Sequence, residues 1–344
     1  KRVRYFPEIN KVFVARKNCT CSLLDPNTFA THQSVPSVNK NRIPILDAAW
    51  VPSAKAVVTS GAECVLRSFR AETAVSTSLV PHREARVEHA QDVLRWSARD
   101  RRLLSGSRNG DCVVWGQYVP FLKGADSLRI QEKWSAHSES LTDMAFVQGS
   151  TRIVTCSLDT TLAVHDLLRS KVVLRFHGHE KGVYSVAHSK AYNCILSAGF
   201  EFSAFIWAEG TPSLQPIKLV DLGVQPHESP LVGVWTSGDT PQVVTCDTSG
   251  LTKIWDLRNH RPIHTLTVPP NQKKSAAKEV LHSYVYLPQR QGFLFNARAT
   301  SHVYESTALD EDVGKAHNQE LIVGAYVCSK QNLIATVTAR ELKI

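Results

Sequence analysis

Three histidines that lie close together could bind a metal ion. His177, His179 and His188 carry imidazole nitrogens, which are common ligands for zinc. His188 has no carboxylate or cysteine beside it, and His179 also belongs to a repeated pattern described below. We therefore expect a structural role for His179, and we expect the chain to hold no metal and no cofactor.

The sequence lacks the common motifs of catalysis. It has no GxxxxGK(S/T) phosphate loop, no GxSxG nucleophile turn and no HExxH zinc motif. The acidic run Asp310, Glu311 and Asp312 lacks the later ligands and the glycine of a calcium loop. These observations disfavour an enzyme and a small-molecule substrate.

A fixed spacing links histidines to later aromatic positions. Three pairs share a separation of 28 residues: His137 and His165, His179 and Trp207, His227 and Trp255. Extended along the chain, the second position of the pair falls at Leu24, Phe69, Trp115, His165, Trp207, Trp255 and Tyr304. The steps between these positions are 45, 46, 50, 42, 48 and 49 residues. Repeats of this length are typical of solenoids and propellers.

Each repeat contains short apolar segments without a helical period. In one repeat these segments are LTDMAFV at 141–147, RIVTCS at 152–157 and TTLAVHD at 160–166. Such runs indicate strands, and turn sequences such as SRNGD at 107–111 precede the third run. Three strands and a stretch able to form a fourth make a propeller blade. The sequence therefore predicts an all-β fold, a seven-bladed β-propeller of four-stranded antiparallel blades over residues 1–306.

The spacing resembles that of WD repeats. In such blades an Asp in the turn before the third strand, a His in the loop entering the blade, a Ser or Thr on the second strand and a Trp on the third share hydrogen bonds. The resemblance implies structural roles for His137, Asp159, His179, Trp207, His227, Trp255 and Trp115. By sequence the set is incomplete in three repeats, where His165 replaces Trp, Glu201 replaces Asp and Ser249 replaces Asp.

The last repeat is cut short. A new repeat begins near His317, and its aromatic position would fall one residue beyond the sequence. Residues 307–344 thus form an eighth repeat that either closes the ring or opens a second propeller. We favour a second propeller, and we expect the sequence to be an excerpt of a longer protein.

Composition bears on the location of the protein. With 344 residues, 43% of them hydrophobic, the chain can bury a large core. No apolar run approaches the length of a membrane span. The eight cysteines lack paired spacing, which favours buried thiols in a reducing compartment. We expect a cytoplasmic or cytoskeletal protein without membrane attachment.

One turn position in each repeat differs in chemistry and could bind partners. The residue before the Asp position of the turn is Ala62, Arg108, Leu158, Phe200, Thr248 and Ala297 in successive repeats. This mixture is unsuited to a ring of catalytic residues and suits a surface that recognises other proteins. We expect exposed side chains at Arg108, Leu158, Phe200, Thr248 and Arg298. Phe200 either anchors a partner or folds inward against Trp207 or a neighbouring blade.

Part of the formal net charge of +9 is clustered. The longest expected loops are 76–88, 117–133 and 269–279, and the basic clusters are Arg99, Arg101 and Arg102, and Lys273, Lys274 and Lys278. They could attract an acidic partner, such as the acidic tails of tubulin, or they could be ordinary solvated residues. No aromatic residues are interleaved with them for base stacking, which disfavours nucleic acid.

Residues 137–266 resemble the large WD-repeat proteins of cilia and flagella, a group that often carries an EF-hand region and two tandem propellers. The matching features are His179 with Lys181–Val183, Ser197–Phe200 ahead of Trp207, and Leu231–Val234 followed by Thr240–Gln242. The resemblance implies a scaffold of the axoneme that binds microtubule-associated complexes and is not an enzyme. The alternative is a WD-repeat adaptor elsewhere, such as a ubiquitin-ligase substrate receptor or a ribonucleoprotein assembly factor.

Overall fold

The computed structural model describes residues 44–71, 79–116, 129–211, 213–221, 225–236, 241–249 and 251–267, strands outside these ranges, and the single residues Ile9 and Gly223. The chain divides into two compact units. Unit 1 comprises Lys1–Trp134 and Ser283–Ile344, and unit 2 comprises Ser135–His282.

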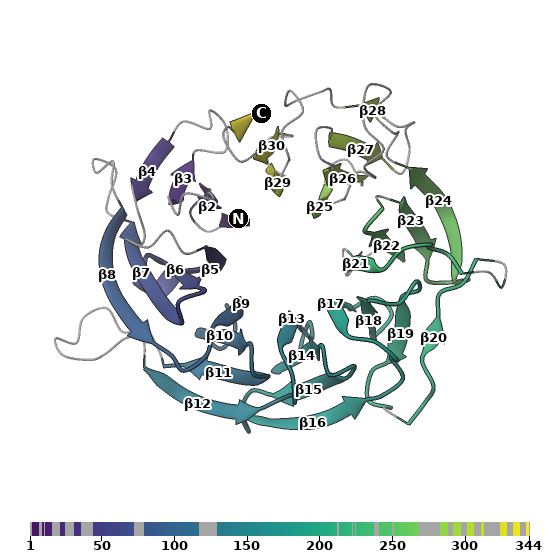
Figure 1. The fold of residues 1–344 in the computed structure, drawn as a ribbon, viewed down its shortest axis with the longest axis horizontal. Helices are drawn as coiled ribbons and strands as arrows, with labels where there is room; N and C mark the ends of the chain where they lie inside the picture. The colour runs from purple at the N-terminus through teal and green to yellow at the C-terminus, as the bar shows by residue number, and fades with distance from the viewer. Residues whose placement is uncertain are drawn as a thin grey trace. The chain divides into compact units, whose positions relative to one another are not determined.

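The described part of unit 2 contains three antiparallel sheets, each of four strands paired in chain order (Figure 1). The fourth sheet of the chain has β13 (Leu141–Phe146), β14 (Arg152–Ser157), β15 (Leu162–Asp166) and β16 (Lys171–Phe176). The fifth has β17 (Val183–Ser189), β18 (Cys194–Gly199), β19 (Phe205–Ala208) and β20 (Ile217–Lys218). The sixth has β21 (Leu231–Thr236), β22 (Gln242–Asp247), β23 (Leu251–Asp256) and β24 (Arg261–Thr267).

The described strands of unit 1 form five further antiparallel sheets. The first sheet has β1 (Arg2–Phe6), β2 (Lys11–Ala15), β3 (Cys21–Leu24) and β4 (Thr31–Val35). The second has β5 (Ile45–Val51), β6 (Ala56–Gly61), β7 (Val65–Ala71) and β8 (Leu79–Arg86). The third has β9 (Gln91–Ser97), β10 (Arg102–Ser107), β11 (Asp111–Trp115) and β12 (Ile130–Ser135). The seventh is β25 (Ser283–Leu287), β26 (Gly292–Asn296), β27 (Ser301–Glu305) and β28 (Glu311–Asp312), and the three-stranded eighth is β29 (Gly324–Cys328), β30 (Leu333–Val337) and β31 (Leu342–Lys343).

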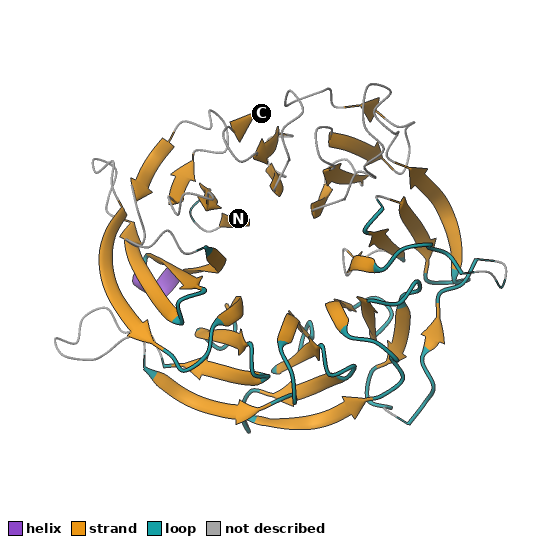
Figure 2. Cartoon of the chain, viewed as in Figure 1, coloured by secondary structure: helices purple, strands orange, loops and turns teal. Residues whose placement is uncertain are grey.

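The predicted fold class is confirmed. Strands dominate the described residues, which contain one short 3-10 helix at Pro52–Ala54 (Figure 2). All seven predicted aromatic positions, from Leu24 to Tyr304, lie on the third strand of a sheet. Segments 76–88 and 117–133 were expected to be loops, but they contain most of the fourth strands β8 and β12. The division at residue 306 and the role of residues 307–344 stay predictions.

The hydrophobic cores lie between consecutive sheets of one unit. Trp207 of the fifth sheet packs with Val154 and Val164 of the fourth, and Trp255 of the sixth packs with Leu196 of the fifth. In unit 1 the same position brings Phe69 and Trp115 against the preceding sheet. Both faces of an inner strand between two sheets of the same unit are therefore covered, which explains runs such as the buried CILSAG of β18.

First strands of consecutive sheets are also joined by carboxylates. In unit 1, Asp47 on β5 accepts hydrogen bonds from the N–H of Leu94 at 3.1 Å and from the Arg95 guanidinium at 2.9 Å, both on β9. In unit 2, Asp143 on β13 accepts from the N–H of Val186 on β17 at 3.3 Å. These bonds align each sheet with the next. Among the described residues, no helix has the length and apolar character needed to cross a membrane.

Candidate functional site

One backbone hydrogen bond recurs in five sheets, at the same end of the strands. The first residue after the second strand donates its N–H to the carbonyl of the residue before the first strand. The pairs are Ala62 to Pro44 at 3.2 Å, Arg108 to Ala90 at 2.9 Å, Leu158 to Ser140 at 3.1 Å, Phe200 to Gly182 at 3.0 Å and Thr248 to Pro230 at 2.9 Å. We call Ala62, Arg108, Leu158, Phe200 and Thr248 the tip residues. The repeated bond makes them structurally equivalent.

A β-bulge lies beside each tip residue, on the first strand of the sheet. The strand register skips Leu46, Asp92, Thr142, Tyr184 and Val232, and we call them the bulge residues. A bulge redirects the extra side chain, often at functional sites. These five residues were not among those predicted from the sequence. Each stands 16 residues before its tip residue, and this constant spacing is a signal that could have revealed them.

Two tip residues pair with their bulge residues through side chains. Arg108 is exposed and binds Asp92 with two bonds, Nε to Oδ2 at 3.0 Å and Nη2 to Oδ1 at 3.1 Å. The hydrogen bond to Asp92 raises the pKa of Arg108. Phe200 is 41% exposed and packs edge to face with Tyr184, with ring centroids 4.8 Å apart and planes at 89°. Phe200 is therefore exposed, and its role as an anchor for a partner stays a prediction.

Leu158 and Thr248 are half-buried, although we expected exposed side chains at both. Leu158 packs on the next sheet, where a Cβ added to Gly182 would lie 3.0 Å from Leu158 Cδ2. The neighbouring Thr142 donates its hydroxyl to the carbonyl of Val183 at 2.7 Å. At this tip, close packing between consecutive sheets covers part of the side chain.

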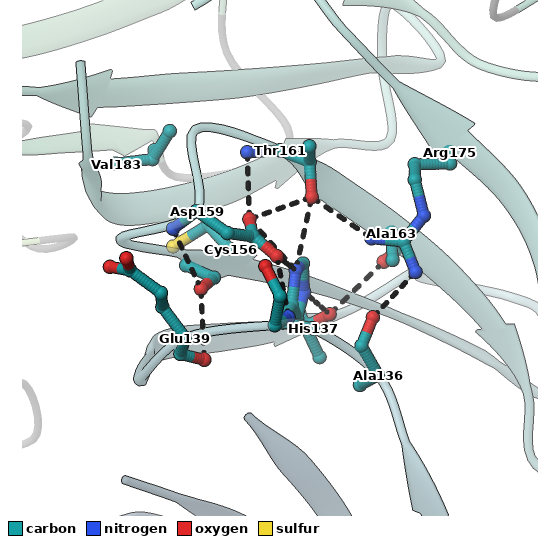
Figure 3. Close-up of polar contacts among 12 residues, drawn as sticks. Ala136, His137, Glu139, Cys156, Asp159, Thr161, Ala163, Arg175 and Val183 are labelled. Carbon is teal, nitrogen blue, oxygen red and sulfur yellow. Dashed lines mark hydrogen bonds and ion pairs between the residues drawn. The ribbon is translucent and has the colours of Figure 1, made fainter. Parts of the chain in front are cut away.

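A hydrogen-bond chain holds the tip turn of the fourth sheet (Figure 3). His137 lies in the lead-in loop, the loop before the first strand, and its Nδ1 is 3.0 Å from Asp159 Oδ2 and 3.1 Å from Thr161 Oγ1. Its Nε2 is 2.8 Å from Thr155 Oγ1, and that hydroxyl is 2.7 Å from His165 Nε2. These hydrogen bonds tie the lead-in loop and the tip turn to the second and third strands.

The direction of these hydrogen bonds follows from which groups can donate and which can only accept. An ionised carboxylate only accepts, so His137 donates from Nδ1 to Asp159, and its Nε2 accepts the hydroxyl hydrogen of Thr155. The Thr155 oxygen then accepts from His165 Nε2. His165 thus donates as a tryptophan indole would. Burial is the main cause that lowers the pKa of His165 to about 3, which keeps the ring neutral.

The Asp159 carboxylate also organises the backbone around it. It accepts from the N–H of Ser138 at 3.0 Å and from the N–H of Thr161 at 2.9 Å. Burial acts to raise the pKa of Asp159, but the bonds from His137 and Thr161 outweigh it and place the pKa well below its usual value. Arg175 completes the arrangement, because it donates to the carbonyl of Ala136 at 2.6 Å (Figure 3).

The fifth sheet has the same series of hydrogen bonds, with a glutamate in place of the aspartate. His179 Nδ1 binds the Glu201 carboxylate, and Nε2 is 2.6 Å from Ser197 Oγ, which accepts from Trp207 Nε1 at 2.7 Å. Burial acts to raise the pKa of Glu201, but the bond to His179 and backbone N–H groups lower it overall. Gly178 has φ 149°, and a Cβ there would lie 3.2 Å from the Trp207 ring. The four-residue hydrogen-bonded set of this repeat, which is incomplete by sequence, is therefore complete with Glu201 in the Asp position.

In the sixth sheet a different residue supplies the carboxylate. His227 Nδ1 is 3.1 Å from Asp247 Oδ2, and Nε2 is 2.9 Å from Thr245 Oγ1, which accepts from Trp255 Nε1 at 2.8 Å. Ser249, which stands at the Asp position by spacing, donates its hydroxyl to Asp247 at 2.6 Å. Sequence spacing therefore missed Asp247, which lies two residues earlier.

The third sheet uses a glutamine instead of histidine. Trp115 Nε1 donates to Ser105 Oγ at 2.9 Å, and Ser105 donates to Gln91 Oε1 at 2.5 Å. The Gln91 amide donates in turn to the carbonyl of His89 at 2.9 Å. The link from third strand to second strand to lead-in segment is kept, and the structural role of Trp115 stays a prediction.

A family model described as the WD domain, G-beta repeat, matches residues 128–166 and 170–208. The chain contains WD repeats. They span strands β12 to β19 and include the networks of His137 and His179. WD repeats are platforms for binding other proteins, so a scaffold or interaction role follows for this chain.

Curated relatives are similar to longer stretches of the chain. Cilia- and flagella-associated protein 337 B of Tetrahymena thermophila is 24% identical over 72% of this chain and 20% of its own length. Denticleless protein homolog of Danio rerio is 25% identical over 43% of this chain and 27% of its own. WD repeat-containing protein 37 of Mus musculus is 23% identical over 51% of this chain and 32% of its own. The chain spans less than a third of each of these proteins.

The predicted basic residues that the structure describes lie away from the tip residues. Arg99 and Arg101 are exposed, and Arg102 is half-buried with Nη1 4.0 Å from Glu132. Arg99 and Arg101 lie in the turn between β9 and β10, and Arg102 begins β10, at the opposite end of the strands from Arg108. Lys273, Lys274 and Arg298 lie outside the described residues.

The three candidate metal ligands do not converge. His179 is held by Glu201 and Ser197, whereas His188 Nε2 lies 3.0 Å from Glu209. Across the described ranges, no group of three or more His, Cys, Asp or Glu side chains could hold a metal ion.

Proposed function

We propose that this chain is a non-enzymatic scaffold that binds other proteins through the tip and bulge residues of its repeats. The observation that carries the proposal is the repetition itself. Five sheets share one backbone hydrogen bond and one bulge, while the side chains at these positions differ from sheet to sheet. Positions that the fold fixes only through the backbone are free to acquire side chains for recognition.

Unit 2 supplies the strongest anchor for a partner. Tyr184 and Phe200 are 45% and 41% exposed and touch each other. Large aromatic side chains that share an exposed surface are typical of the residues that contribute most to protein binding. The backbone beneath them is fixed by the bond from Phe200 N–H to Gly182.

For the cellular setting we propose the axoneme of a cilium or flagellum, where the scaffold docks protein complexes on doublet microtubules. Two observations support this setting. Residues 137–266 carry the features that resemble ciliary WD-repeat proteins, and the relative aligned over 72% of the chain is named for cilia and flagella. The location would then be the cytoplasm and its cytoskeleton.

A second candidate is a WD-repeat adaptor outside the axoneme, such as a ubiquitin-ligase substrate receptor or a ribonucleoprotein assembly factor. It is favoured by the similarity to Denticleless protein homolog and to WD repeat-containing protein 37, whose names make no reference to cilia. Their alignments cover about half of this chain or less.

Fractionation of ciliated cells tests both candidates. The tagged full-length protein should remain with detergent-stripped, salt-washed axonemes, and Phe200→Ala combined with Tyr184→Ala should release it into the soluble fraction. Leu168→Ala is the matched control, because Leu168 is 70% exposed at the opposite end of the strands in unit 2. Recovery with a cullin complex or with RNA would support the adaptor. Equal retention of both variants, with unchanged melting, would contradict binding through the tips.

The basic residues suggest a contact with tubulin. We propose that Arg99, Arg101 and Arg102, with Lys273 and Lys274, bind the acidic tails of tubulin, because the chain has a net charge of +9. Binding to microtubules should weaken as salt rises past physiological strength, where the screening length is about 8 Å. A co-sedimentation assay with intact and tail-cleaved microtubules measures this. Equal binding to both would rule out recognition of the tails.

A further inference from the structure

We propose that the aromatic patch of unit 2, defined as Leu158, Tyr184 and Phe200, binds a cationic segment of a partner protein through the guanidinium of an arginine. This inference rests on the proposed function, because it specifies the partner of the same tips. The expected partner is a protein segment with an exposed arginine.

The patch offers open aromatic surface. Tyr184 and Phe200 meet edge to face at 89°, so the ring that presents its edge has neither of its faces covered by the other ring. Both side chains are more than two-fifths exposed. The face of an aromatic ring carries negative potential and attracts a cation.

The charges around the patch also favour a cation. The lead-in loops of unit 2, residues 136–140, 177–182 and 225–230, carry three exposed glutamates: Glu139, Glu180 and Glu228. In Figure 3 the Glu139 carboxylate points away from the network around His137. Apart from histidines, the described part of these loops has one basic residue, Lys181. The local charge is therefore opposite in sign to the net charge of the chain.

These loops lie at the same edge as the tips. The N–H of Ser138 binds Asp159, and the N–H of Glu180 binds Glu201 at 2.6 Å, and both carboxylates belong to tip turns. The lysine of the same loop already makes a contact of the proposed kind, since Lys181 Nζ lies 5.3 Å from the centroid of the Phe202 ring. That lysine is thus directed at an aromatic ring of its own tip turn.

Other partner chemistries fit this surface less well. An acidic peptide or a nucleic acid would bring negative charge towards the three glutamates. Arginine is better suited than lysine, because its planar guanidinium stacks on an aromatic face and is more weakly hydrated. The exposed carboxylates can then pair with the guanidinium N–H groups that the ring does not cover.

Fluorescence anisotropy with the full-length protein tests the inference. The probes are four labelled Gly/Ser dodecapeptides that carry three residues of arginine, lysine, citrulline or glutamate. We expect the arginine peptide to bind more tightly than the citrulline peptide, and the glutamate peptide to bind most weakly. Phe200→Leu, which keeps apolar bulk but removes the ring, should weaken arginine binding about two- to fivefold. Leu168→Ala should leave it unchanged.

The charge contribution has its own variant. Glu180→Gln with Glu228→Gln should weaken arginine binding and reduce its dependence on salt, while melting stays the same. Equal affinity for arginine and citrulline, or no effect of Phe200→Leu, would overturn the inference. If the tip variants release the protein from its native complex although no arginine peptide binds, the inference fails and the proposed scaffold function stands.

Discussion

His165 should make the protein sensitive to mild acid. It is fully buried on β15 and donates to Thr155, and burial disfavours the charged form of its ring. Its pKa is lowered to about 3, from an ordinary value of 6.5. Because the folded pKa is below the unfolded pKa, the stabilisation is present above pH 6.5 and is lost progressively as pH falls towards 3.

The magnitude follows from proton linkage. Between pH 7 and pH 5 the unfolded chain takes up a proton on His165 that the folded chain does not, at about 1.4 kcal/mol for each pH unit below 6.5. The free energy of unfolding should therefore fall by about 2 kcal/mol from this residue alone. The paired carboxylates contribute little in this window, since the pKa of each of Asp159, Glu201 and Asp247 is lowered and they stay ionised.

The assay is urea unfolding at pH 7.0 and pH 5.0, for the natural sequence and for His165→Phe. Phenylalanine fills the site without a titratable group, so the variant should lose about 2 kcal/mol less than the natural sequence over this pH step. Histidines that are remote from His165 contribute equally to both proteins and cancel in the difference. Equal acid losses in the two proteins would refute the assignment of His165 as the source.

Three further predictions concern the networks that hold the tips. His179→Ala should lower the free energy of unfolding by about 1 to 3 kcal/mol, because the Ser197 hydroxyl and the Glu201 carboxylate lose their partner; an unchanged melting curve would contradict the role of His179. Trp207→Ala should cost about 3 to 5 kcal/mol in urea unfolding, because the ring fills the core between two sheets; access of acrylamide to Trp207 in the natural protein would exclude this packing. Asp247→Ala should destabilise the protein more than Ser249→Ala in parallel melts, because Asp247 binds both His227 and Ser249. A larger loss for Ser249→Ala would contradict the assignment of Asp247 as the partner of His227.

Much of the fold could be predicted from local sequence. The 28-residue spacing and the apolar runs located the third strands, including those of Phe69 and Tyr304, because strand and turn lengths within a blade vary little. The fourth strands β8 and β12 were missed as strands, since they form the outer edge of a sheet and alternate little in polarity. Their pairing with the third strand makes them strands.

The sequence by itself determined the repeat, the strand class and the equivalence of the tip residues, because each depends on separations within one blade. Tertiary structure decided which side chain takes each role. Glu201 reaches His179 with a longer side chain, and Asp247 replaces the residue that spacing selects at 249. The pairing of Tyr184 with Phe200 depends on a bulge that extends one strand against another. Hydrogen bonds and ring contacts require atoms to meet in space, and residue spacing along the chain fixes only which atoms are near enough to do so.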